Sequence, residues 1–386
     1  MDVAIVGIGI HPFGRFEGVS ALEMGVAATR QALDDAGIGW RDVQFAYGGS
    51  LGHTLGHGSA MPDNMVSQLG LTGLQFVNVA NGCATAGSAV LMAASTIEAG
   101  AFDLGVAIGF DKHPRGHFNA DPAVQGLPAW YGELGMFVTT QFFAMKIQRY
   151  LHDHGVSRAT LAKVAAKAYR NGARNPNAWR RKPFSEEEIL ASATLNDPLT
   201  QYMFCSPDEG AAAVVMCRAD RAARYTDRPV YLRASTIRTR RFGSFEVFSP
   251  SLPVARTESP TVDAARACFE QAGIAPGEVG VAQIQDSEAG AEIMHMAETG
   301  LCADGEQQSM IEAGDTEIGG RLPVNTDGGL IANGEPIGAS GMRQVYETVL
   351  QLRGDAGDRQ VPGEPRVGFT QVYGAPGVGA CSILTR

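Results

Sequence analysis

The sequence has no excess of positive charge. Among its 386 residues, 41 are acidic and 31 are Lys or Arg, which gives a formal net charge of −10. Because nucleic-acid binding depends on clustered Lys and Arg that neutralise phosphates, this balance argues against nucleic acid as the main partner. Charged residues make up only 19% of the chain and hydrophobic residues 45%, with 48 glycines. This composition is typical of a tightly packed globular protein, and the length suffices for two domain-sized cores.

The sequence also lacks the features of a membrane or secreted protein. No uninterrupted apolar run reaches the roughly 20 residues that span a bilayer. The first residues, MDVAIVGIGIHPFG, become apolar at residue 3 without a positive leader or a small-residue cleavage site, so we expect a buried first strand. Six cysteines occur without CxxC pairs or His partners at metal spacing. We therefore expect reduced thiols, no metal site and a cytoplasmic protein.

The chain contains an internal repeat. Residues 26–49 align without a gap to residues 262–285, and both copies contain Ala-Gly-Ile. Each copy is typical of a helix that ends at a glycine and is followed by a strand. A second shared phrase, ANGCATAG at 80–87 and ANGEPIG at 332–338, precedes a further helical stretch and strand in each copy. The pattern predicts an α/β protein with two βαβαβ halves related by an approximate two-fold.

This repeat divides the chain into three parts. Residues 1–111 form the first part of the N-terminal half, and residues 226–386 form the C-terminal half. Residues 112–225 lack the repeat and contain helical pieces and loops before a return to the core. We expect this inserted region to bind substrate, because insertions on a repeated core are where binding loops occur.

One cysteine differs from the others in its surroundings. Cys83 lies among small residues at the predicted start of a helix, where the positive helix end would stabilise a thiolate and lower its pKa, as nucleophilic catalysis requires. In the second copy Glu335 occupies the equivalent position, so the two-fold predicts that both residues face one site. Most free buried cysteines are small packing residues, and we interpret the other five in this way.

The phrase NGCATAGSAV at 81–90 resembles the nucleophile motif of thiolases. Four further stretches resemble the thiolase-like lipid-transfer proteins, which are relatives of the sterol-carrier-protein thiolase: GFDKHPRGHF (109–118), NPNAWRRKPF (175–184), DPLTQYMFCSPDEGAAAVVM (197–216) and LPVNTDGG (322–329). The resemblance extends from end to end. It implies the thiolase fold, in which two duplicated βαβαβ halves form a layered αβαβα core. It also implies a coenzyme A thioester as substrate and no tightly bound cofactor.

Three of the four functional positions depart from the thiolase pattern. Cys83 matches the nucleophile, but the histidine of the family's GHP motif is replaced by Glu335 in GEP. The Asn or His that helps to build the oxyanion hole is replaced by Gln285 in QDSE. The second base should lie within residues 370–377, where the nearest candidates are Gln371 and Tyr373 and no Cys or His is present. Of these two, Tyr373 can act as an acid or a base. Ordinary thiolysis is therefore in doubt.

These changes favour retro-aldol cleavage of a 3-hydroxyacyl-CoA. The resemblance to the lipid-transfer branch implies that the acyl group is a steroid or other lipid side chain. This reaction needs a base for the β-hydroxyl proton and no acyl-enzyme. Asp286, Glu335 and Tyr373 are the candidate bases, and Gln285 can donate to an oxyanion. Glu335 at a helix start is expected to stay ionised. The alternatives are a thiolase or acyltransferase that uses Cys83 as nucleophile, and a non-catalytic subunit that binds lipid or acyl-CoA.

Two basic stretches that contain aromatic residues, at 179–184 and 237–245, are candidates for coenzyme A binding, because cations and aromatic rings suit its phosphates and adenine. The candidate residues are Trp179, Arg180, Arg181, Arg240 and Arg241. The resemblance further implies a homodimer that pairs through the edge strand beside the nucleophile. It also implies a separate partner protein with a zinc ribbon and an OB fold.

Overall fold

The structure is a computed structural model that describes residues 2–52, 61–118, 123, 128–135, 139–244, 258–375 and 377–386. The large sheet is built from β1 (Val3–Gly14), β2 (Phe45–Gly49), β3 (Gln75–Val79), β4 (Leu104–Lys112), β7 (Glu209–Arg218), β8 (Val230–Thr239), β9 (Val281–Ile284), β10 (Val367–Gly374) and β11 (Val378–Thr385). Their order across the sheet is β3-β2-β4-β7-β1-β8-β11-β10-β9. A small hairpin joins β5 (Thr194–Asn196) to β6 (Leu199–Thr200).

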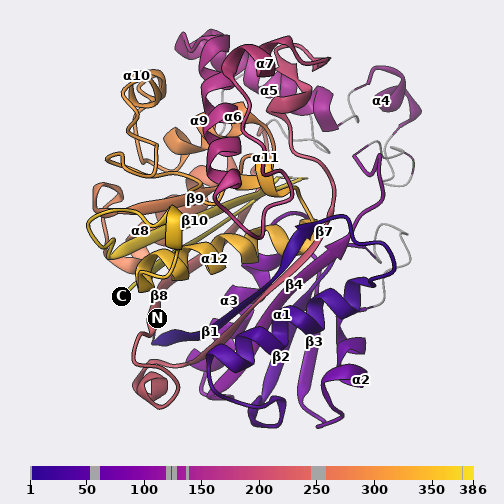
Figure 1. The fold of residues 1–386 in the computed structure, drawn as a ribbon, viewed down its shortest axis with the longest axis vertical. Helices are drawn as coiled ribbons and strands as arrows, with labels where there is room; N and C mark the ends of the chain where they lie inside the picture. Colours follow the sequence, from indigo (N-terminus) through magenta and orange to yellow (C-terminus); the bar gives the residue numbers. More distant parts are fainter. Residues whose placement is uncertain are drawn as a thin grey trace.

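The helices of the described residues are α1 (Ala21–Asp35), α2 (Val66–Leu69), α3 (Thr85–Glu98), α4 (Ala129–Glu133), α5 (Thr139–His154), α6 (Arg158–Ala173), α7 (Glu186–Ala191), α8 (Pro260–Ala272), α9 (Ala289–Glu298), α10 (Gln307–Glu312), α11 (Gly329–Asn333) and α12 (Ile337–Arg353). Figure 1 shows how they are distributed around the sheet. In this described part, no helix has both the length and the apolar character that crossing a membrane requires.

The large sheet consists of two similar halves joined by a short contact. Strands β1 and β8 pair only through residues 3–5 and 230–232. In the first half β3, β2 and β4 are parallel, and β7 and β1 follow in antiparallel pairing. In the second half β9 and β10 are parallel, β11 and β8 follow in antiparallel pairing, and a bridge from Val324 to Ala282 occupies the place of β3. The predicted duplication is confirmed.

Helices and half-sheets alternate in layers (Figure 1). Helix α1 packs on the outer face of the first half. Helices α3 and α12 lie between the halves, and α8 packs on the outer face of the second half. Close approach of α12 to β4 depends on Gly109, because a Cβ atom there would lie 2.2 Å from the carbonyl oxygen of Gly338. The layered αβαβα core predicted from the sequence is confirmed.

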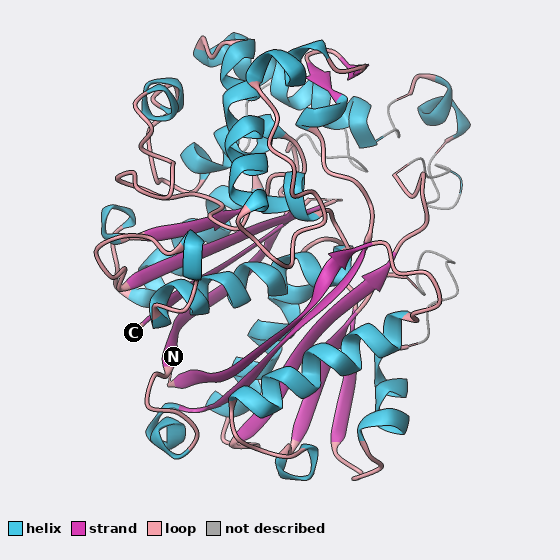
Figure 2. Cartoon of the chain, in the orientation of Figure 1, coloured by secondary structure: helices cyan, strands magenta, loops and turns pink. Residues whose placement is uncertain are grey.

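The inserted region covers one end of this core (Figure 2). Helices α5 and α6 pack against α9 and α11 of the second half, and together they bury an apolar cluster that includes Tyr373 of β10. Strand β7 then returns the chain to the first half-sheet. The helical cap therefore lies against the end of β10 that carries the predicted site residues.

Candidate active site

The turn that carries Cys83 is held by the end of β10. Gly82 adopts φ 55°, a left-handed conformation that favours glycine. Gly374, the last residue of β10, approaches so closely that a Cβ atom there would lie 3.0 Å from the backbone nitrogen of Cys83. The backbone of Ala375 hydrogen-bonds the Cys83 sulfur. Cys83 is therefore fixed two residues before α3 by backbone contacts from the other half of the fold.

Three side chains converge on the carboxylate of Glu335. Gln285 Nε2 donates to Glu335 Oε1 at 2.9 Å, and Cys205 Sγ donates to Oε2 at 3.3 Å. The Cys83 thiol also hydrogen-bonds this carboxylate. The backbone N–H of Glu335 donates to the carbonyl of Ser206 at 2.9 Å. The structure thus brings Cys83 and Glu335 together, as the two-fold predicts, and places Gln285, a residue assigned from the family resemblance, beside them. We call these three residues with Cys205 the Glu335 cluster.

The expected lowering of the Cys83 pKa is wrong. Part of Cys83 is accessible, but its thiol is enclosed, and this burial raises its pKa well above the ordinary value. The charge of Glu335 and its hydrogen bond act in the same direction. Only the backbone of Ala375 favours the thiolate to a notable degree. The sulfur is therefore held as a thiol, first because it is buried and second because a carboxyl group occupies the place where a thiolase would present an activating base.

Glu335 is also less acidic than its position predicts. Burial raises its pKa, although the thiols, Gln285 and a nearby histidine act against this effect. We expected the backbone N–H groups at the start of α12 to keep Glu335 ionised, but they already have other partners. The N–H of Gly338 donates to Asp111 Oδ2 at 2.5 Å, and the N–H of Ile337 donates to His113 Nε2 at 3.2 Å. The pKa of Glu335 is thus raised by its burial, which makes its carboxyl group a better proton acceptor than an exposed glutamate.

Cys205 and His113 were not assigned to the site from the sequence. Cys205 is buried and was interpreted as a packing residue. His113 is fully buried, lies 3.3 Å from Asp111 Oδ2, and follows the carboxyl end of β4. The sequence position of His113 could have indicated a site residue. It is the first residue after β4, and ligands bind outside the carboxyl ends of strands in α/β sheets.

The two remaining candidate bases have different surroundings. Asp286 is fully buried, which raises its pKa well above the ordinary value. Its oxygens accept hydrogen bonds from the backbone of Leu330 at 2.6 Å and Ile331 at 3.4 Å, so it anchors the start of α11. Tyr373 is buried on β10, with Lys146 Nζ 4.4 Å from its ring centroid. Asp286 is occupied by backbone donors, whereas Tyr373 lies on β10 just before Gly374 and Ala375, whose backbone contacts the Cys83 turn.

Comparisons with known proteins decide the family. A family model described as the thiolase N-terminal domain matches residues 3–220, and one described as thiolase C-terminal domain-like matches residues 254–386. The chain belongs to the thiolase family. The resemblance inferred from NGCATAGSAV and the implied thiolase fold are therefore confirmed.

The similar proteins place this thiolase in the lipid-transfer branch. An acetyl-CoA acetyltransferase of Methanothermobacter thermautotrophicus is 32% identical over 100% of both chains. Sterol carrier protein 2 of Oryctolagus cuniculus is 30% identical over 94% of this chain and 68% of its own. The solved Ltp2-ChsH2(DUF35) aldolase matches 100% of this chain and 97% of its own chain with a TM-score of 0.86 and 25% identity.

The predicted coenzyme A residues of this thiolase do not share one environment, because one points into the protein and three are exposed. Arg180 points inward: its Nη1 donates to the carbonyl of Ile331 at 2.9 Å, its other guanidinium nitrogen donates to Ser206 Oγ, and it lies over the Trp179 ring. Arg181, Arg240 and Arg241 are exposed, and Arg241 also pairs with an aspartate of α8 at 2.6 Å. Arg180 therefore connects α11 to the segment that carries Cys205. Coenzyme A binding by this group stays a prediction.

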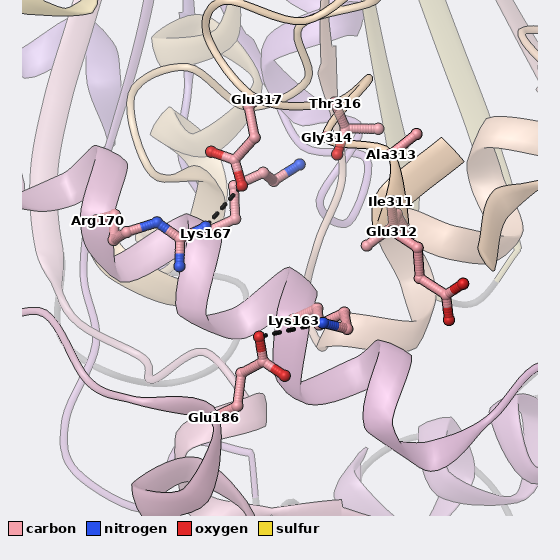
Figure 3. Close-up of a pocket in the computed structure, with 10 residues that line it drawn as sticks. All are labelled: Lys163, Lys167, Arg170, Glu186, Ile311, Glu312, Ala313, Gly314, Thr316 and Glu317. Atoms are coloured by element: carbon pink, nitrogen blue, oxygen red, sulfur yellow. Dashed lines mark hydrogen bonds and ion pairs between the residues drawn. The ribbon is translucent and has the colours of Figure 1, made fainter. Parts of the chain in front are cut away.

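A separate pocket of about 220 Å³ lies between α6 and the segment that follows α10 (Figure 3). Its basic side chains have acidic partners: Lys163 contacts Glu186 at 3.4 Å, and Arg170 contacts Glu317 at 2.6 Å. None of the lining residues belongs to the Glu335 cluster. This pocket does not contribute to the candidate site of the thiolase.

The charge relation between Glu335 and Cys83 predicts a change in thiol reactivity. Glu335→Gln removes the charge that helps to raise the Cys83 pKa, so more thiolate forms at a given pH. We expect alkylation of Cys83 by iodoacetamide at pH 8 to become about tenfold faster or more, since one pKa unit is a tenfold change in thiolate.

Peptide mass spectrometry over a pH series would measure this rate. Glu312→Gln, at an exposed glutamate of α10, is the matched control and should leave the rate unchanged. Equal rates in wild type and Glu335→Gln would show that Glu335 does not control the thiol.

Proposed function

We propose that this thiolase-family acyl-CoA enzyme cleaves the Cα–Cβ bond of a 3-hydroxyacyl-CoA by a retro-aldol reaction. The observation that carries the proposal is the Glu335 carboxylate in hydrogen-bond contact with the Cys83 thiol. Thiolysis requires a Cys83 thiolate, which burial of the sulfur opposes most strongly and the neighbouring Glu335 carboxyl group opposes further. A reaction without an acyl-enzyme avoids this penalty.

The residues at the site suit the steps of this cleavage. The Tyr373 oxygen accepts the proton of the β-hydroxyl, the oxygen electrons form a carbonyl, and the Cα–Cβ electrons pass to the thioester as an enolate. Gln285 donates a hydrogen bond to the thioester oxygen as negative charge develops there. Glu335, whose pKa is raised by burial, gives its proton to Cα. The products are an aldehyde or ketone and a shorter acyl-CoA, and Asp286 has a supporting role at α11.

The comparisons support two readings of the same site. The similarity to an aldolase over the whole chain supports carbon–carbon cleavage without acyl transfer. The 32% identity to an acetyl-CoA acetyltransferase supports the second candidate, a thiolase or acyltransferase that uses Cys83 as nucleophile. For the substrate, we propose a steroid or other lipid side chain, which the similarity to sterol carrier protein 2 supports. A cytoplasmic location stays a prediction from cysteine usage.

Paired variants separate these two candidates. We expect Cys83→Ala to keep retro-aldol activity within about tenfold of wild type, because no acyl-enzyme forms. We expect Glu335→Gln to lose about 100-fold or more, which is the usual contribution of a positioned acid or base. Chromatography of the acyl-CoA and carbonyl products, with 3-hydroxyacyl-CoA and with 3-oxoacyl-CoA plus free coenzyme A, measures both reactions. Rapid thiolysis by the wild-type enzyme, together with loss of all activity in Cys83→Ala, would establish the second candidate.

We also propose two protein partners. The name of the similar solved aldolase joins two proteins, Ltp2 and ChsH2. This supports a separate zinc-ribbon and OB-fold partner for this chain.

The second partner is another copy of the chain, which would pair through β3, an edge strand of the described sheet. Val77 on β3 is 38% exposed, and the nearby Leu71 and Met92 are also exposed apolar side chains. An unpaired edge with apolar side chains is suited to strand pairing between subunits.

Dimerisation through β3 predicts a change in mass. Sedimentation of wild type should give twice the chain mass of 40.7 kDa, and Val77→Asp should give the monomer, because a buried charge would face its symmetry mate. Leu190→Asp on α7 is the matched control, since Leu190 has the same 38% exposure. A wild-type monomer, or a dimer that survives Val77→Asp, would contradict this interface.

A further inference from the structure

A second group of charged side chains surrounds Tyr373 and has no part in the reaction described so far. Lys146 comes from α5, and His295 and Glu298 come from α9. The His295 ring lies 5.6 Å from the Tyr373 ring, and the Lys146 Nζ lies 4.4 Å from the centroid of that ring. Glu288, immediately before α9, completes the group. These residues come from the inserted region and from the second half, so the fold assembles them around β10.

The acidic members of this group have their own partners. Glu298 Oε2 contacts His295 Nδ1 at 2.5 Å. Although burial acts in the opposite direction, the charges of His295 and Lys146 lower the pKa of Glu298 to about 2. Glu288 Oε2 accepts the N–H of Gly290 at 2.5 Å, and burial raises the pKa of Glu288 to about 8. The His295–Glu298 pair and the cap of α9 are therefore each complete without a hydrogen bond from Lys146.

Lys146 is left with a buried ammonium group. In the described part of the chain, its Nζ has no hydrogen-bond partner and almost no contact with solvent. The charge of Lys146 acts on Glu298 and Glu288, but no hydrogen bond joins them to its Nζ. A buried ammonium group without a hydrogen-bond partner is costly and favours a further anion beside it. The group whose ring face it contacts is Tyr373. Attraction between a cation and an aromatic face increases with the electron density of the ring, and a phenolate ring is richer in electrons than a phenol.

We infer that Lys146 is a positioning residue that stabilises the tyrosinate form of Tyr373 and so makes Tyr373 the group that accepts the β-hydroxyl proton. This inference rests on the proposed retro-aldol function. The tyrosinate oxygen takes the proton and becomes a neutral phenol, while the negative charge moves through the breaking Cα–Cβ bond to the enolate. Glu335 protonates the enolate, and Tyr373 returns a proton to Glu335 before the next turnover. Protons and electron pairs balance over the cycle.

Variants of Lys146 test this role through the pH dependence of turnover. Lys146→Met keeps most of the side-chain volume but removes the charge, and Lys146→Arg keeps the charge. We expect Lys146→Met to lower kcat at pH 7 by about tenfold or more, which corresponds to one unit or more in proton affinity, with KM little changed. The loss should diminish towards pH 10, where Tyr373 ionises without help, and Lys146→Arg should remain near wild type.

A loss in Lys146→Met that is constant with pH, or an equal loss in Lys146→Arg, would overturn the inference and indicate a packing role. Thermal unfolding of each variant checks that the fold is retained.

A measurement that does not depend on turnover separates this inference from the proposed function. Ultraviolet titration of tyrosinate absorbance, taken as the difference between wild type and Tyr373→Phe, isolates Tyr373. We expect ionisation at lower pH in wild type than in Lys146→Met. Identical curves would overturn the inference whatever reaction the enzyme catalyses. The expected difference, found in an enzyme that cleaves no 3-hydroxyacyl-CoA, would support the role of Lys146 and contradict the retro-aldol function alone.

Discussion

The carboxylate of Glu335 beside the thiol of Cys83 is the interaction on which the rest of the site depends. In a buried site, a charge next to a thiol determines whether the sulfur can ionise, because there is little water to screen it. Here burial and a negative neighbour both raise the Cys83 pKa. The same burial raises the pKa of Glu335. A carboxyl group at position 335 therefore disfavours the Cys83 thiolate and is itself a group whose proton is held more tightly than usual.

The duplicated fold makes this contact. Cys83 precedes α3 and Glu335 precedes α12, and these two helices lie together between the half-sheets. The end of β10 then fixes the Cys83 turn through backbone contacts at Gly374. Because these contacts are made by backbone and by small residues, the geometry tolerates a change of side chain at position 335. The chemistry can thus vary while the scaffold stays the same.

The sequence predicted the scaffold well because a repeat carries positional information. The gapless match of residues 26–49 to 262–285 correctly placed the equivalent halves, and the shared ANG phrases correctly placed Cys83 against Glu335. Cys205 and His113 were missed because they come from regions outside the repeat. The direction of the Cys83 pKa shift is wrong as predicted from the sequence, because a helix start is a local feature and burial is not. Burial and the neighbours that set a pKa come from segments far apart in the chain.

The most direct test of this account is the mass of the intact protein during turnover of a 3-hydroxyacyl-CoA without free coenzyme A. The account predicts that a carbonyl compound and a shorter acyl-CoA accumulate while the protein mass stays unchanged. A mass increase equal to the acyl group, mapped to Cys83 and removed when coenzyme A is added, would contradict it and show that the thiol is a working nucleophile.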